Sequence, residues 1–138
     1  MSKTRAKRLQ PLPKNPVVCP AKYAEEKPVF SFEYLVEGRL EKPKRNQDLY
    51  RDFLIRLKHL SELGWEEIGK SQRHGYGFEL IPREQFKPQM PETVTPDIRK
   101  LFVFRSDGAN HAFAGFRRDD IFFVVFIESD FNELYDHG

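Results

Sequence analysis

Apolar residues in the last third of the chain fall into three short runs, at residues 101–105, 111–116 and 121–127. Polar segments rich in Asp, Asn, Gly and Arg separate these runs, as is typical of turns between strands. The third run consists entirely of apolar residues, a pattern that indicates a short strand covered on both faces. The pattern therefore predicts three successive strands, with residues 121–127 in the middle of an antiparallel sheet.

Two further strands are predicted upstream of this region. Residues 29–36 alternate in part, and one face of that segment is wholly apolar, consisting of Phe30, Phe32, Tyr34 and Val36. A period of two residues is the signature of a half-buried strand. Residues 76–81 are the other predicted strand, and Pro82 ends it because proline has no backbone N–H to donate to a sheet.

A long helix is predicted between these two strands. Its apolar stripe has the spacing of a helix that packs one face on a core, and consists of Leu49, Phe53, Leu57 and Leu60. Asn46 is the expected N-cap and Gly64 the expected stop, which gives a length of about 16–18 residues. Trp65 then begins a second, shorter helix.

This order of elements predicts an α+β fold for a single domain at residues 29–138. We expect an antiparallel sheet of about four to five strands, with one long and one short helix packed on it. Residues 82–99 form a long connection that contains four prolines. Connections of this length inside a domain are typical of functional or mobile loops.

Residues 1–28 differ in composition from the rest of the chain. They contain five prolines and seven basic residues against two acidic ones, so the remaining residues carry a net charge of −3 although the whole chain carries +2. We expect an extended or disordered arm. Two interpretations stay open, a basic arm that touches RNA, DNA or a protein partner and a solvated linker. The acidic remainder argues against nucleic-acid binding through bulk charge alone.

Other features of the composition narrow the classes of protein that fit. The single cysteine, Cys19, excludes an intramolecular disulfide and a cysteine-based metal site. No apolar run approaches the length of about 20 residues that a membrane-spanning helix needs. The N-terminal region also lacks the apolar stretch of a signal peptide. We therefore expect a cytoplasmic protein that does not associate with membranes.

Candidate chemistry lies at the ends of the predicted strands. The sequence has no Walker or dinucleotide glycine loop, no His-x-x-x-His zinc motif and no Gly-x-Ser-x-Gly elbow. What remains is a set of cationic, imidazole and phenol side chains, namely Arg73, His74, Arg105, His111, Arg117, Tyr135 and His137. Strand ends of one sheet can converge on a single concave face.

Such a set suits cleavage of an RNA phosphodiester bond without a metal ion. A histidine, or a tyrosine of lowered pKa, can remove the proton of the ribose 2′-OH. Arginine stabilises the charge that develops on the phosphoryl group. A second histidine can protonate the leaving 5′ oxygen, because the pKa of histidine lies near neutrality.

The last third of the chain resembles the RelE/ParE superfamily of bacterial toxins, especially the RelE and HigB mRNA interferases. The residues that carry the resemblance are Phe102-Val-Phe-Arg105, Ala114-Gly-Phe116, residues 121–127 and Tyr135-Asp-His137. The resemblance covers about residues 29–138. It implies a RelE-like fold and a metal-independent endoribonuclease that needs no cofactor. Its implied partners are mRNA on the ribosome and a small protein antitoxin.

The resemblance also implies roles for individual residues. His74 would take the place of the mid-chain catalytic residue, and Arg105 would hold the phosphate. Tyr135 and His137 would form the C-terminal acid–base pair. Beside these four catalytic candidates, the residues expected to contact RNA are Arg73, His111 and Arg117.

Two features of the chain depart from the family's pattern. The family's sites are rich in lysine, whereas Lys70 and Lys100 are the only lysines near these candidates. The domain is also acidic without its arm. The alternative hypothesis is a non-catalytic module on the same fold, which binds a protein or a nucleic acid through the arm and residues 82–99.

Overall fold

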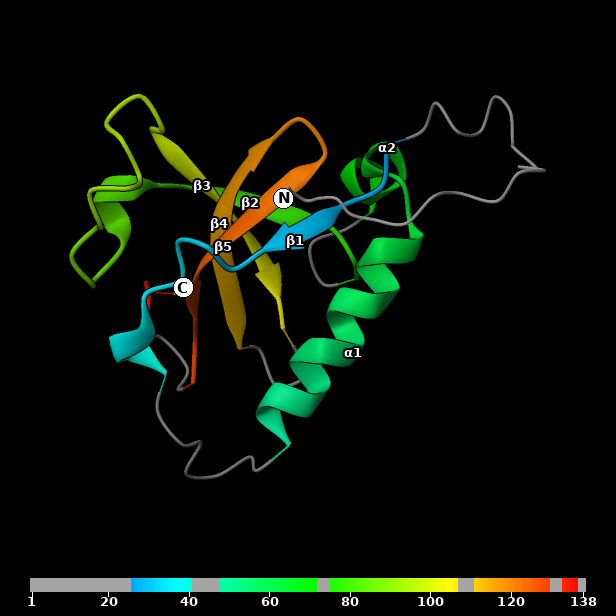
Figure 1. Ribbon diagram of the computed structural model, residues 1–138, viewed down its shortest axis with the longest axis horizontal. Coiled ribbons are helices and arrows are strands. Elements are labelled where there is room, and N and C mark those ends of the chain that lie inside the picture. The colour runs from blue at the N-terminus through cyan, green and yellow to red at the C-terminus, as the bar shows by residue number, and fades with distance from the viewer. Residues whose placement is uncertain (1–25, 41–47, 72–74, 107–110, 130–132, 137–138) are drawn as a thin grey trace.

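A five-stranded sheet with the strand order β1-β5-β4-β3-β2 forms the centre of the computed structural model (Figure 1). The structure describes residues 26–40, 48–71, 75–106, 111–129 and 133–136. The strands are β1 (Val29–Ser31), β2 (Phe78–Pro82), β3 (Lys100–Arg105), β4 (Ala112–Arg118) and β5 (Ile121–Ile127). The helices are α1 (Leu49–Glu62) and α2 (Trp65–Lys70), and Glu37–Arg39 and Arg83–Gln85 form single 3-10 turns.

The α+β architecture with one long and one short helix is confirmed, but the sheet is mixed and open. Strands β2 to β5 are antiparallel neighbours, as predicted. Strand β1 instead runs parallel to β5, so the prediction of a wholly antiparallel sheet is wrong at this edge. Val29 donates its backbone N–H to the carbonyl of Asp120, in the turn before β5, at 3.0 Å. The two strands therefore start at the same end and run in the same direction.

The predicted strand at residues 29–36 ends after three residues. The Ser31 hydroxyl accepts a hydrogen bond from the Glu33 backbone N–H at 3.2 Å, and Leu35 N–H donates to the Phe32 carbonyl at 3.1 Å. This turn divides the apolar face that the alternation predicted. Phe30 packs on the side of the sheet that carries the helices, whereas Tyr34 packs on the opposite side.

Both helices cover one face of the sheet (Figure 1). The predicted stripe of α1 is buried in full, and α2 adds Trp65 and Ile68. Aromatic rings of three strands pack beneath them, including Phe104, Phe113 and Phe122. The helix begins at Leu49 with Asp48 at the N-cap position, and the predicted cap Asn46 lies outside the described residues.

The long connection after β2 covers the opposite face of the sheet. Phe86 and Val94 from this connection are buried together with Leu134 and Tyr135 from the C-terminal segment. The connection and the C-terminal segment therefore form a second covering layer. This layer explains why residues 121–127 are apolar on both sides. A strand that is covered on both faces of its sheet needs apolar residues at every position.

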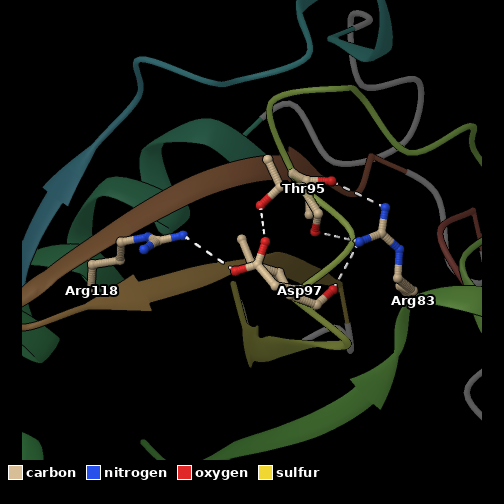
Figure 2. A network of polar contacts seen from close by, with 6 residues as sticks. Arg83, Thr95, Asp97 and Arg118 are labelled. Atoms are coloured by element: carbon tan, nitrogen blue, oxygen red, sulfur yellow. Dashed lines mark hydrogen bonds and ion pairs between the residues drawn. The ribbon is translucent and has the colours of Figure 1, made fainter.

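Arginine 83 holds this covering loop in shape (Figure 2). Its guanidinium donates hydrogen bonds to the backbone carbonyls of Thr95 at 2.7 Å, Ile98 at 2.9 Å and Val94 at 3.1 Å. The Thr95 hydroxyl donates to the Asp97 carboxylate, which lowers the pKa of that carboxyl group. The exposed carboxylate also lies 3.9 Å from Arg118 of β4. The loop is thus fixed by contacts within itself and by one ion pair with β4.

A β-bulge interrupts the pairing of β4 with β5. Ala114 pairs with Phe126 and the next residue, Gly115, pairs with Val124, so Val125 is the extra residue. Val125 and Phe126 consequently pack on the same side of the sheet. The carbonyl of Val125 accepts a hydrogen bond from the Val36 N–H at 2.9 Å. The bulge therefore anchors the segment that follows β1.

Candidate functional site

Two of the predicted site residues, Arg105 and His111, lie at the same end of the sheet. Arg105 is the last residue of β3 and pairs with Ala112, the first residue of β4. Beyond this pair, the Ser106 N–H donates to the His111 carbonyl at 2.8 Å. Both side chains are half-buried. The hairpin thus places a guanidinium at the end of β3 and an imidazole just before β4.

Arg117 lies at the opposite end of the sheet. It follows Ala112 by five residues along β4, a separation of roughly 15–20 Å in an extended strand. Its guanidinium stacks over the Trp65 ring at 4.2 Å and lies 3.4 Å from the Glu26 carboxylate. Its Nε donates to the Asp119 carbonyl at 2.6 Å. Arg117 therefore joins the β4–β5 turn to α2, and the structure does not bring it together with Arg105.

Tyr135 is buried in the covering layer, with 6% of its surface exposed. Its ring packs 5.8 Å from that of Phe86, and its neighbour Leu134 is fully buried. The Leu134 carbonyl accepts a hydrogen bond from the Lys87 N–H at 2.6 Å. The sequence predicted that Tyr135 takes part in acid–base chemistry. The structure gives its ring a packing role.

A buried carboxylate, Glu128, holds this C-terminal segment against the sheet. Glu128 is fully buried, and its Oε2 accepts a hydrogen bond from the Leu134 N–H at 3.1 Å. Its Oε1 accepts one from the Ala112 N–H at 3.0 Å. Because Ala112 follows His111 directly, Glu128 brings Tyr135 to the same end of the sheet as His111 and Arg105.

The remaining predicted site residues, Arg73, His74 and His137, lie outside the described residues. Within the described ranges, no group of three or more His, Cys, Asp or Glu side chains is arranged to hold a metal ion. Neither helix in this part of the chain has the length and apolar character needed to cross a membrane.

A second polar group, which the sequence pattern did not predict, consists of Arg56, His59 and Tyr76. We call it the Tyr76 cluster. The Tyr76 hydroxyl and His59 Nδ1 lie 3.1 Å apart, within hydrogen-bond distance. The Arg56 guanidinium lies 4.8 Å from the centre of the Tyr76 ring and donates to the Gly75 carbonyl at 2.8 Å. No local spacing indicates this cluster, because α1 and the segment before β2 meet only in the folded chain.

The Tyr76 cluster lies on the helix side of the sheet, where the Tyr76 ring packs against the core. Strand β2 begins at Phe78, which pairs with Phe104, next to Arg105. The segment that precedes β2 therefore enters the sheet at the same end as Arg105 and His111. Arg105 alternates with Phe104 and pairs with Ala112, so it faces the side of the sheet opposite the helices, whereas the Tyr76 ring packs on the helix side.

Comparison of the chain with family models, with curated proteins and with solved structures found no match.

Proposed function

We propose that the protein is a metal-independent endoribonuclease that cleaves mRNA through attack of a ribose 2′-OH, in the manner of RelE-like toxins. The observation that carries this proposal is the end of the sheet where β3 ends and β4 begins. Arg105 ends β3 there and His111 directly precedes β4, and Glu128 fixes the segment that contains Tyr135 at the same end. These side-chain types match what phosphodiester cleavage needs.

Each residue has a defined task in this proposal. The Arg105 guanidinium binds a non-bridging phosphate oxygen and stabilises the charge that develops during attack. His111 contacts the RNA beside it. The partners are mRNA, translated on the ribosome, and a small protein antitoxin, and both belong to the proposed RelE-like character of the chain. The cytoplasm is the proposed location.

Substitution at the proposed phosphate site should lower cleavage without unfolding the protein. We expect Arg105→Gln to reduce kcat/KM on a labelled mRNA by about 10²–10³-fold in the presence of EDTA, because the transition state loses a charged donor. Gel analysis of the cleavage products measures this change. Arg118→Gln is the matched control, since Arg118 is an exposed arginine at the other end of β4. Equal rates for the two variants would contradict the proposal.

A non-catalytic binding module is the second candidate function. It is favoured by the internal contacts of two predicted site residues, because the Tyr135 ring is buried and Arg117 is held between Trp65 and Glu26. In this case the protein would retain RNA or a protein partner without cleaving RNA. The cleavage assay combined with a filter-binding measurement on the same RNA distinguishes the two functions.

A further inference from the structure

Strand β2 leaves one edge of the sheet open. It is the last strand in the sheet order, and within the described residues its only neighbouring strand is β3. Leu80, at its centre, is 46% exposed, whereas Ile81 beside it is buried. An open edge presents N–H and C=O groups that another strand can join, unless charges, prolines or bulges in the middle of the strand prevent it. The middle of β2 instead carries an exposed leucine.

The hydrogen bonds between β2 and β3 determine which backbone groups point to that edge. The Arg83 N–H donates to the Arg99 carbonyl at 3.0 Å, in the same register as the β2–β3 pairs. Bonded and non-bonded positions alternate along an antiparallel pair, so every second residue back from Arg83 bonds to β3. The residues between them, Phe78, Leu80 and Pro82, direct their backbone groups away from β3. At Pro82 this position explains why a missing N–H costs the sheet no hydrogen bond.

We propose that the open edge of β2 pairs with the same edge of a second copy of this chain, about a two-fold axis at Leu80. In this register each Leu80 donates its N–H to the Leu80 carbonyl of the other copy. Each Phe78 N–H donates to the Pro82 carbonyl of the other copy, which points outward. Glu79 lies opposite Ile81 of the other copy, so no two like charges face each other. The two sheets thereby join into one continuous sheet.

Other registers of the same edge are less favourable. An axis at Glu79 would set the two Glu79 carboxylates directly opposite each other, and like charges in that position destabilise a sheet. An axis at Ile81 would place Pro82, which has no N–H, opposite Leu80 near the centre of the pair. The axis at Leu80 keeps Pro82 at the ends. It also packs the two exposed leucines together on the side of the sheet that carries the helices, since Leu80 lies opposite Phe102 of that side.

The two edges of the sheet differ, and this difference limits the assembly to a dimer. Strand β1, at the other edge, has three residues and ends in the turn at Ser31. A head-to-tail contact between β2 and β1 would therefore pair few residues, and it would extend from copy to copy without closing. Pairing of β2 with itself uses all five of its residues and closes after two copies. The chemistry of the edge thus fits a second copy of the chain.

Sedimentation equilibrium of the full chain over a dilution series tests the dimer. We expect a mass of twice the chain mass of 16.3 kDa at high concentration. Leu80→Lys should raise the dissociation constant of the dimer by about 10²-fold or more, because it removes the leucine contact and sets two like charges opposite each other. Leu54→Lys is the matched control on the exposed face of α1 and should leave that constant unchanged. A wild type that stays monomeric, or equal constants for the two variants, overturns the proposal.

Hydrogen exchange at single amides tests where the two copies meet. In a monomer the Leu80 N–H points to water and exchanges fast, whereas the Ile81 N–H is bonded to β3 and is protected. As the protein concentration rises, exchange should become slower at Leu80 and Phe78, with little change at Ile81. Leu80→Lys should keep the fast exchange of Phe78 at every concentration. A dimer in which the Leu80 amide still exchanges as fast as in the monomer places the contact elsewhere and overturns the proposal.

Discussion

Replacement of Gly115 by alanine should destabilise the protein more than any other single methyl group added to the sheet. A Cβ atom at this position would lie 1.9 Å from the Phe123 carbonyl oxygen and 3.0 Å from the Phe122 ring. The carbonyl belongs to the backbone of β5, so relief of the clash requires the two strands to separate at the bulge. We expect a loss of about 3 kcal/mol or more in the free energy of unfolding, measured by urea denaturation.

Gly69→Ala is the matched control for this substitution. Gly69 lies in α2, and an added Cβ atom there meets nothing within 4 Å. Alanine favours a helix over glycine, so the control should be neutral or more stable by up to about 1 kcal/mol. If Gly115→Ala unfolds at the same urea concentration as the wild type, the close approach of β4 and β5 described above is wrong.

Replacement of Glu128 by alanine should have the second largest effect on stability. The substitution removes the acceptors of two backbone N–H groups, those of Ala112 and Leu134, and leaves a cavity in a fully buried place. Each unsatisfied buried donor costs about 1–3 kcal/mol, so we expect a total loss of about 3 kcal/mol or more. Hydrogen exchange should also become faster at the Ala112 and Leu134 amides.

A pair of glutamine substitutions checks the cause of this effect. Glu128 uses both of its carboxylate oxygens, so Glu128→Gln places an NH₂ group against a backbone N–H and should cost about 1–3 kcal/mol. Glu133 accepts from the Ser129 N–H and hydroxyl through Oε1, which a glutamine oxygen can replace. Glu133→Gln should therefore cost less than Glu128→Gln. Equal losses in the two variants would contradict the anchoring role of Glu128.

Local patterns predicted most of the elements because their causes are local. The stripe of α1 and the apolar runs of β3, β4 and β5 depend on which face of each element is buried, and that periodicity is visible in the sequence. The direction of the edge strand β1 does not have a local cause. Whether β1 runs parallel or antiparallel to β5 depends on where the chain enters the sheet, and no residue pattern within Val29–Ser31 records it.

The candidate site was predictable only as far as chain connectivity determines it. A short hairpin brings the end of β3 and the start of β4 together, so Arg105 and His111 share one end of the sheet. Because β4 runs away from this hairpin, Arg117, near the end of β4, lies at the other end of the sheet. The Tyr76 cluster and the burial of Glu128 depend on contacts between distant segments, which spacing along the chain does not encode.

The most direct test of the proposed endoribonuclease uses the wild-type protein and one pair of substrates. A short RNA is compared with the same RNA carrying 2′-deoxyribose at the cleaved position, both in EDTA, and the product ends are identified by mass spectrometry. Attack by the 2′-OH predicts cleavage of the RNA alone, with a 2′,3′-cyclic phosphate at the new end. Cleavage of both substrates, or binding of the RNA without any cleavage, would contradict it.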